Sequence, residues 1–343
     1  MAHLLEVNNL AVSYHTYQGE VQSVRGVSFF MEEGETVALV GESGCGKSVT
    51  AKSLMRLIRE NGEIKKESQI QFEGQDILKL KKKELSSYRG EKVSMIFQDA
   101  LASLNPTMKV GYQITEMLTL HKKMSASDAK AAAIEIMQSV GIPDAKNRFG
   151  LYPHSFSGGQ RQRIMIGIAL ACNPKLLIAD EPTTALDVTI QDQIMELLRS
   201  MQEKNHTAIL IITHDLGVVA NLAKRVYVMY AGKIVEEGTS QEIFYEPKHP
   251  YTWALLKAVP RLDQEGKGKL ESIIGTPPDL ISPPAGCPFA PRCKYCMNLC
   301  RQRDALPTEY SSTHRASCWL YDTRAPQVTP PQFLQKKGGG QNV

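Results

Sequence analysis

The chain has 343 residues, of which 42% are hydrophobic and 22% are charged, the balance of a globular protein with room for two or three domains. Its net charge of only +4 does not fit a nucleic-acid binder, which needs a concentrated basic face; we expect the one dense cationic run, residues 79–83, to be a solvated helix face or loop. Because no apolar run reaches the roughly 18 residues of a membrane span and no secretion signal is visible, we expect a cytosolic chain that meets a membrane only through partners.

The first part of the chain favours strands followed by a helix. Residues 4–7 and 27–30 fit sheet strands. Residues 36–40 form an apolar, β-rich run that ends at a glycine, as a buried parallel strand does. A helix is expected from residue 47 to about residue 58.

Helices and buried strands alternate along the middle of the chain. We expect helices over residues 110–141, 157–171 and 189–204 and buried strands over residues 176–179 and 208–212. Ser125 supplies a helix start within the first of these ranges. The βαβ order predicts an α/β fold with a helical insert between the first strand and the later ones.

Composition changes after about residue 259, where prolines, cysteines and a glycine-rich tail appear. We therefore predict a boundary near Pro260, with a first domain over residues 1–258 that includes a helical subdomain at about 100–172. Residues 259–343 form a Cys- and Pro-rich extension, and its last dozen or so residues are expected to be disordered.

The segment that follows the strand of residues 36–40 has the spacing G-x-x-x-x-G-K-[ST]. Its glycines let the backbone curl so that successive N–H groups face one anion, and the next helix presents its positive end to the same anion. Lys47 is expected to reach the β- and γ-phosphates of a nucleotide, and Ser48 to ligate Mg²⁺. The loop consists of Gly41, Glu42, Ser43, Gly44, Cys45, Gly46, Lys47 and Ser48, with Cys45 expected to contribute only its backbone N–H.

A pair of acids follows the strand of residues 176–179. Asp180, at the strand end, is placed to hold the Mg²⁺ shell, and Glu181 to polarise an attacking water. Together with the glycine loop, these residues predict a nucleotide triphosphatase.

A second helix start is suited to anions. Ser157-Gly158-Gly159-Gln160 opens a helix without side-chain bulk, and a second phosphate-binding helix start is best explained if it covers the nucleotide of another subunit. Here the sequence resembles the ABC ATPase family, whose signature is L-S-G-G-Q; Phe156 replaces the leucine. The resemblance implies a RecA-like P-loop core with an antiparallel β subdomain and a helical signature subdomain.

Further positions match landmarks of that family. Gln98 matches the Q-loop glutamine, which meets Mg²⁺ and water and couples to the membrane subunits, and His214 matches the switch histidine at the γ-phosphate. Ala185-Leu186-Asp187 matches the D-loop at the dimer interface, and Tyr14 matches the aromatic residue that stacks on adenine, with Tyr17 as an alternative. The nucleotide-binding residues implied are Tyr14, Gly41, Ser43, Gly44, Cys45, Gly46, Lys47, Ser48, Val49, Gln98 and Asp180, with Ser157, Gly158, Gly159, Gln160 and Asp187 acting across the dimer. Catalytic roles fall to Lys47, Gln98, Glu181 and His214, and ATP and Mg²⁺ are the implied cofactors.

The tail resembles the C-terminal region of oligopeptide/dipeptide permease ATPases, as does Asn105-Pro106-Thr107-Met108. This resemblance covers residues 244–252 and 286–320. It implies uptake of short peptides at the cytoplasmic face of the cell membrane. The implied partners are a second, related ATPase chain, two membrane permease subunits and an extracytoplasmic binding protein, with no nucleic acid. Nickel or another small solute is the alternative cargo within the subfamily.

Five of the seven cysteines lie between Cys287 and Cys318, which in a reducing cytosol indicates metal ligation before disulfides. Cys287, Cys293, Cys300 and Cys318 match a pattern that the resemblance associates with a [4Fe–4S] cluster, but four thiolates also suit Zn²⁺. We favour Cys296 as the spare, although Cys293, Cys296 and Cys300 also make a plausible run of ligands. Without a metal, these cysteines would simply pack a loop-rich tail.

Two other functions compete with transport. A non-transport ABC ATPase usually carries two ATPase cores or a long coiled-coil insert, whereas this chain has one P-loop, one signature and a short helical insert. A metal-sensing regulator would explain the cysteines, but not the full set of catalytic residues.

Overall fold

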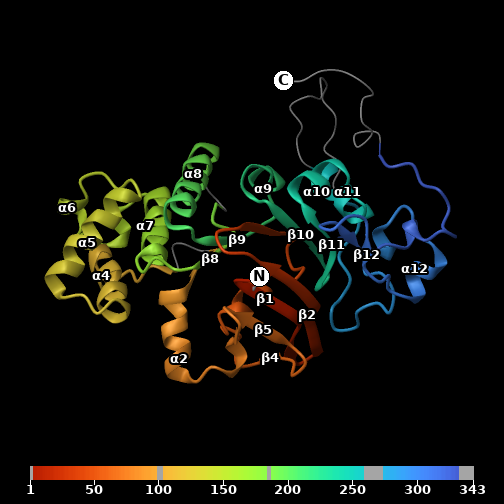
Figure 1. Ribbon diagram of the computed structural model, residues 1–343, viewed down its shortest axis with the longest axis horizontal. Helices are drawn as coiled ribbons and strands as arrows, with labels where there is room; N and C mark the ends of the chain where they lie inside the picture. Colours follow the sequence, from red (N-terminus) through yellow and green to blue (C-terminus); the bar gives the residue numbers. More distant parts are fainter. Residues whose placement is uncertain (1–2, 99–102, 184–186, 259–272, 332–343) are drawn as a thin grey trace, which may run out of the picture.

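The structure is a computed structural model that describes residues 3–98, 103–183, 187–258 and 273–331 (Figure 1). It contains a mainly parallel central sheet, an antiparallel sheet, a group of helices at one end and a C-terminal extension at the other. Within these residues, no helix has the length and apolar character needed to cross a membrane. The predicted α/β fold with a helical insert is confirmed.

The central sheet contains the predicted buried strands. Strands β10, β3, β9, β8 and β7 pair in parallel, so their carboxyl ends lie at one edge. The strands in spatial order are β12 (Thr308–Glu309), β13 (Arg315–Ala316), β11 (Lys233–Thr239), β10 (Arg225–Tyr230), β3 (Thr36–Val40), β9 (Ala208–Thr213), β8 (Leu176–Asp180) and β7 (Val93–Ile96). Every residue of β3, β8 and β9 is buried, as expected for parallel strands covered on both faces.

The antiparallel sheet packs on one face of the central sheet. Its strands are β2 (Gly19–Met31), β1 (Leu5–Thr16), β5 (Gln69–Phe72) and β6 (Gln75–Asp76), with β4 (Gly62–Ile64) paired to β1. Leu5 and Phe72 of this sheet share a core with Ile178 and Leu210 of the central sheet and with helix α1 (Lys47–Leu54). The short helix α2 (Lys82–Ser87), in which Lys82 and Lys83 are exposed as expected, leads on toward β7.

The opposite face of the central sheet is covered by helices. Alternate residues such as Leu177 and Ile211 point into a core formed with α7 (Gly158–Leu170) and α8 (Val188–Asn205). The helical insert adds α4 (Val110–His121), α5 (Ala126–Ser139) and α6 (Ala145–Arg148) to this core. The predicted start at Ser125 is confirmed, because its hydroxyl accepts a hydrogen bond from the backbone N–H of Asp128.

The extension packs beside β11 and the helices that follow it. Helices α9 (Leu216–Leu222), α10 (Ser240–Tyr245) and α11 (Pro250–Lys257) precede it, and α12 (Asn298–Gln302) lies within it. Strand β13 pairs with β11, so residues from the tail extend the central sheet. At this junction the buried Glu236 carboxylate accepts hydrogen bonds from the backbone of Lys248 and His249 and lies 2.8 Å from His314 Nε2.

Two helix ranges differ from those expected from the sequence, and one expectation concerns residues that the structure does not describe. Helix α1 ends at Leu54 and not near residue 58, because Arg56 takes a left-handed φ of 51° that turns the chain away. The range 110–141 holds two helices, with Lys123 at a φ of 56° between them. The tail residues 332–343, expected to be disordered, lie outside the described residues.

Candidate nucleotide site

The phosphate-binding loop runs from the end of β3 to the start of α1, as its spacing predicted. Gly41 and Gly46 have φ values of 152° and 104°, and a Cβ at either would lie 2.1 Å from Met229 O or 2.3 Å from Ser23 O. Only glycine fits these two positions. Ser43 and Gly44 are exposed at the crest of the loop, while Cys45 and Lys47 are buried.

Lys47 and Ser48 connect the loop to the second motif. The ammonium of Lys47 donates hydrogen bonds to the carbonyls of Gly41 (2.7 Å) and Glu42 (3.0 Å), so it lies folded over the loop. The hydroxyl of Ser48 donates to Asp180 Oδ1 at 2.9 Å. Burial raises the pKa of Asp180, and the hydrogen bond from Ser48 opposes that rise. The geometry thus brings together Ser48 and Asp180, two of the three side chains predicted to meet Mg²⁺; the third, Gln98, contacts Glu181.

Glu181 is held by Gln98 and His214, two other predicted site residues. Gln98 Nε2 donates to Glu181 Oε2 at 2.8 Å, and His214 Nδ1 lies 3.2 Å from Glu181 Oε1. The backbone of Glu181 has a φ of 49°, which is unusual outside glycine, and its N–H donates to Ile212 O. Strain of this kind clusters at functional sites, where the surrounding structure imposes it.

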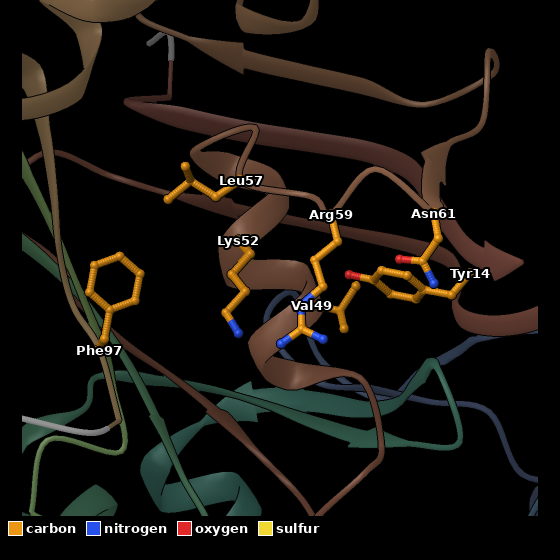
Figure 2. A pocket seen from close by; sticks show the side chains of 7 residues that line it. All are labelled: Tyr14, Val49, Lys52, Leu57, Arg59, Asn61 and Phe97. Atoms are coloured by element: carbon orange, nitrogen blue, oxygen red, sulfur yellow. The ribbon is translucent and has the colours of Figure 1, made fainter. Parts of the chain in front are cut away.

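Tyr14 lines a pocket of about 590 Å³ alongside α1 (Figure 2). Val49, which directly follows Ser48, lines the same pocket, so the pocket adjoins the phosphate-binding loop. Burial raises the pKa of Tyr14, whereas the alternative, Tyr17, is fully exposed. The remaining lining residues are Lys52, Leu57, Arg59, Asn61 and Phe97. The aromatic ring of Tyr14 and the apolar side chains suit a nucleotide base, and the cations Lys52 and Arg59 suit the phosphates attached to it.

The signature residues open α7 as predicted. Ser157 Oγ accepts from the N–H of Gln160, and the Gln160 side chain accepts from the N–H of Ser157 in return. Ser157 and Gly158 are exposed, as is Asp187, whose carboxylate caps the start of α8. This leaves the first N–H groups of α7 at the surface of the chain, while Ala185 and Leu186 of the predicted D-loop lie outside the described residues.

The four cysteines of the predicted metal pattern line one small cavity together with His249. Cys296 does not line it, and all the thiols are free. Burial raises the pKa of Cys287 and Cys318 to about 12. Among the described residues, no three His, Cys, Asp or Glu side chains are arranged to hold a metal ion, so the predicted iron–sulfur or zinc site is not confirmed.

Residues 24–184 match the family described as ABC transporter, and residues 235–300 match the oligopeptide/dipeptide transporter C-terminal region. The chain is 54% identical over 334 residues to the oligopeptide transport ATP-binding protein OppD of Bacillus subtilis (strain 168), covering 97% of this chain and 93% of that protein. The chain belongs to the ABC transporter family. It is also 54% identical to the dipeptide transport ATP-binding protein DppD of Lactococcus lactis subsp. cremoris (strain MG1363), over 95% of this chain and 93% of that one.

A solved structure supports the same assignment. A dimeric ATP-binding cassette in a post-hydrolysis state, bound to ADP and Pi, superposes with a TM-score of 0.62 at 26% identity, covering 69% of this chain and 98% of that chain. The RecA-like core with an antiparallel and a helical subdomain is thus confirmed, and this chain is an ABC ATPase.

Sequence reasoning missed several groups near the site. Lys52, Arg59 and Asn61 line the pocket with Tyr14, but a pocket assembled from a helix and the turn after it leaves no fixed spacing in the sequence. Arg292, which contacts the phosphate-binding loop, lies 250 residues away from it in the chain, and no sequence pattern links the two.

Proposed function

We propose that this chain hydrolyses ATP to drive uptake of dipeptides or oligopeptides across the cytoplasmic membrane, from its position on the cytoplasmic face. The observation that carries the hydrolytic part is the Glu181 carboxylate, held between Gln98 and His214 one residue after Asp180. A carboxylate fixed beside the Mg²⁺-binding pair is suited to orient or deprotonate water.

The roles follow from the contacts. Lys47 would exchange its hydrogen bonds with the loop carbonyls for hydrogen bonds to phosphate oxygens. Ser48 and Asp180 would hold Mg²⁺, which would supply positive charge to neutralise the charge that develops on the phosphates. Water attacks the γ-phosphorus in line while the bond from phosphorus to the β–γ bridging oxygen breaks and ADP leaves; Glu181 takes up the proton of the water, and His214 stabilises the γ-phosphate oxygens. Gln98 donates a hydrogen bond to Glu181, and in this proposal it couples the nucleotide site to the membrane subunits.

A complete site needs a second ATPase chain. The exposed start of α7, with Ser157 to Gln160, and the exposed Asp187 serve the partner's nucleotide, so ATP joins two chains and hydrolysis releases them. The dimeric cassette among the structural neighbours supports this arrangement. The subfamily resemblance favours a related chain as the partner, on two permease subunits served by an extracytoplasmic binding protein.

The proposal that the cargo is a peptide rests on the similarity to proteins named for peptide transport. Proteins named for oligopeptide and dipeptide transport match almost the whole chain, and the region matched over residues 235–300 bears the same description. Nickel or another small solute is the second candidate. Competition of labelled tripeptide uptake by unlabelled peptides and by Ni²⁺ distinguishes the two cargoes.

The hydrolytic role is tested with Glu181→Gln, which keeps the shape of the side chain. We expect the variant to bind ATP, to turn over about a thousandfold more slowly, and to accumulate as an ATP-bound pair of ATPase chains. Hydrolysis near the wild-type rate would show that Glu181 does not serve the water.

A structural metal at the cysteines is a separate part of the proposal. The observation behind it is that Cys287, Cys293, Cys300 and Cys318 line one cavity, where His249 Nε2 is buried and has no hydrogen-bond partner among the described residues. Anaerobic purification followed by metal analysis is the test: bound iron with absorption near ~400 nm indicates the cluster, and one zinc indicates Zn²⁺. A protein free of both metals leaves the cysteines as packing groups.

A further inference from the structure

The C-terminal extension reaches the phosphate-binding loop through one arginine. Arg292 Nη1 and Nη2 donate to the two carboxylate oxygens of Glu42 at 2.5 and 2.9 Å. Glu42 is the second residue of the loop, between Gly41 and Ser43. The Arg292 side chain is only 4% exposed and that of Glu42 is 24% exposed. Paired, shielded contacts of this kind are the strong and directional class of ion pair.

Arg292 is fixed independently of Glu42. Its Nη1 also donates to the hydroxyl of Tyr230 (3.1 Å), its Nη2 to Ile273 O (3.0 Å) and its Nε to Ile274 O (3.1 Å). A guanidinium has five N–H groups, and all five have an acceptor. Arg292 is therefore a rigid point on the extension, and the Glu42 carboxylate raises its pKa further above its usual value.

Glu42 is in turn connected to the reactive part of the loop. Its N–H donates to the hydroxyl of Tyr251 at 2.8 Å, and its carbonyl accepts from Lys47 Nζ at 3.0 Å. The rings of Tyr230 and Tyr251 lie 4.5 Å apart, and both lie 5.3 Å from Phe289, three residues before Arg292. One buried cluster thus joins the extension to the loop that carries Lys47.

We propose that Arg292 is a positioning residue for the phosphate-binding loop, so that the extension sets the affinity of the site for ATP. This inference rests on the ATP site proposed above. Arg292 orients Glu42, and through it the loop carbonyls and Lys47. It also neutralises a carboxylate that would otherwise repel the phosphates from within the loop that binds them.

The size of the effect follows from this electrostatic argument. When Arg292 is replaced by a neutral residue, the Glu42 charge is released beside a polyanion in a partly shielded site. At an effective dielectric constant of about 20, we expect the KM for ATP to rise about tenfold. Because neither residue contacts the group around Glu181, kcat is expected to change less than the KM, through the displacement of Lys47 alone.

The experiment measures ATP hydrolysis by the full chain assembled with its membrane partners, for Arg292→Gln, Glu42→Gln and the double variant. Arg303→Gln, an exposed arginine on the same extension, is the matched control and is expected to behave as wild type. Arg292→Gln should raise the KM about tenfold, and adding Glu42→Gln should return it to within about threefold of wild type, because the released charge is gone.

The melting temperature measured without nucleotide distinguishes two roles of Arg292: positioning the phosphate-binding loop, or only attaching the extension to the rest of the protein. If Arg292→Gln lowers the melting temperature but leaves the KM unchanged, or if Glu42→Gln does not restore the KM, the proposal is overturned. Should Arg292→Gln fail to fold, Arg292→Lys keeps the charge but loses the paired geometry. We expect its KM about threefold above wild type, and an unchanged KM would overturn the proposal. A wild-type chain that binds no ATP would instead overturn the proposed function and this inference with it.

Discussion

Two glycines of the phosphate-binding loop provide a matched test of why the loop has its shape. Gly44 and Gly46 both have positive φ values, 80° and 104°, so an alanine at either is strained. A Cβ at Gly46 would lie 2.3 Å from Ser23 O of β2, whereas a Cβ at Gly44 would meet no atom of the described residues within 4 Å. Gly44→Ala therefore measures only the free-energy cost of placing alanine at a positive φ. Gly46→Ala has the same cost and adds a steric clash with the Ser23 carbonyl.

The conformational cost is about 1–2 kcal/mol for each variant. At Gly46 the loop and β2 must also separate by about 1 Å, and overpacking of this kind costs about 1–3 kcal/mol more. We expect Gly46→Ala to lower the free energy of unfolding of the nucleotide-free protein by about 2–5 kcal/mol, against about 1–2 kcal/mol for Gly44→Ala. Because α1 starts at Lys47, the displaced loop should also weaken ATP binding about a hundredfold.

Urea unfolding followed by tryptophan fluorescence measures the first effect, and equilibrium binding of a fluorescent ATP analogue measures the second. Equal losses of stability in the two variants would refute the steric reasoning, because only Gly46 faces the Ser23 carbonyl.

Two further predictions concern the base pocket and the attachment of the extension. Tyr14→Ala should raise the KM for ATP about tenfold by removing a stacking surface, while Tyr17→Ala should leave it within about twofold; equal effects would contradict the assignment of Tyr14. Burial raises the pKa of Glu242, but hydrogen bonds from groups such as Ser311 and Thr313 outweigh it and lower the pKa to about 2. The folded-state pKa is depressed, so this stabilisation is present above about pH 4.5 and is lost as the pH falls toward 2. Glu242→Gln should therefore unfold at lower urea than wild type at pH 7, and by a clearly smaller margin at pH 3; an equal difference at both values would refute the assignment.

The parts of the site that lie next to each other in sequence were predictable. The loop from Gly41 to Ser48 and the pair Asp180 and Glu181 follow buried strands, and parallel strands bring their carboxyl ends to one edge. Local spacing and strand order were enough to place these groups together.

Contacts between distant segments were not predictable. Strand β13 has two residues and joins β11 some 80 positions earlier, which no periodicity reveals. The pair of Arg292 and Glu42 likewise depends on how the extension folds against β10 and α11. For the cysteines, spacing indicated metal ligands, but among the described residues the structure shows free thiols around a small cavity and no group of side chains arranged to hold a metal.

The most direct test of the central claim is ATP-dependent uptake of a labelled tripeptide into vesicles that contain the complete transporter. The account predicts uptake with the wild-type chain, and predicts that Glu181→Gln, although it still binds ATP, supports none above the ATP-free background. Peptide uptake at the wild-type rate with Glu181→Gln would contradict the claim that hydrolysis at this site drives transport.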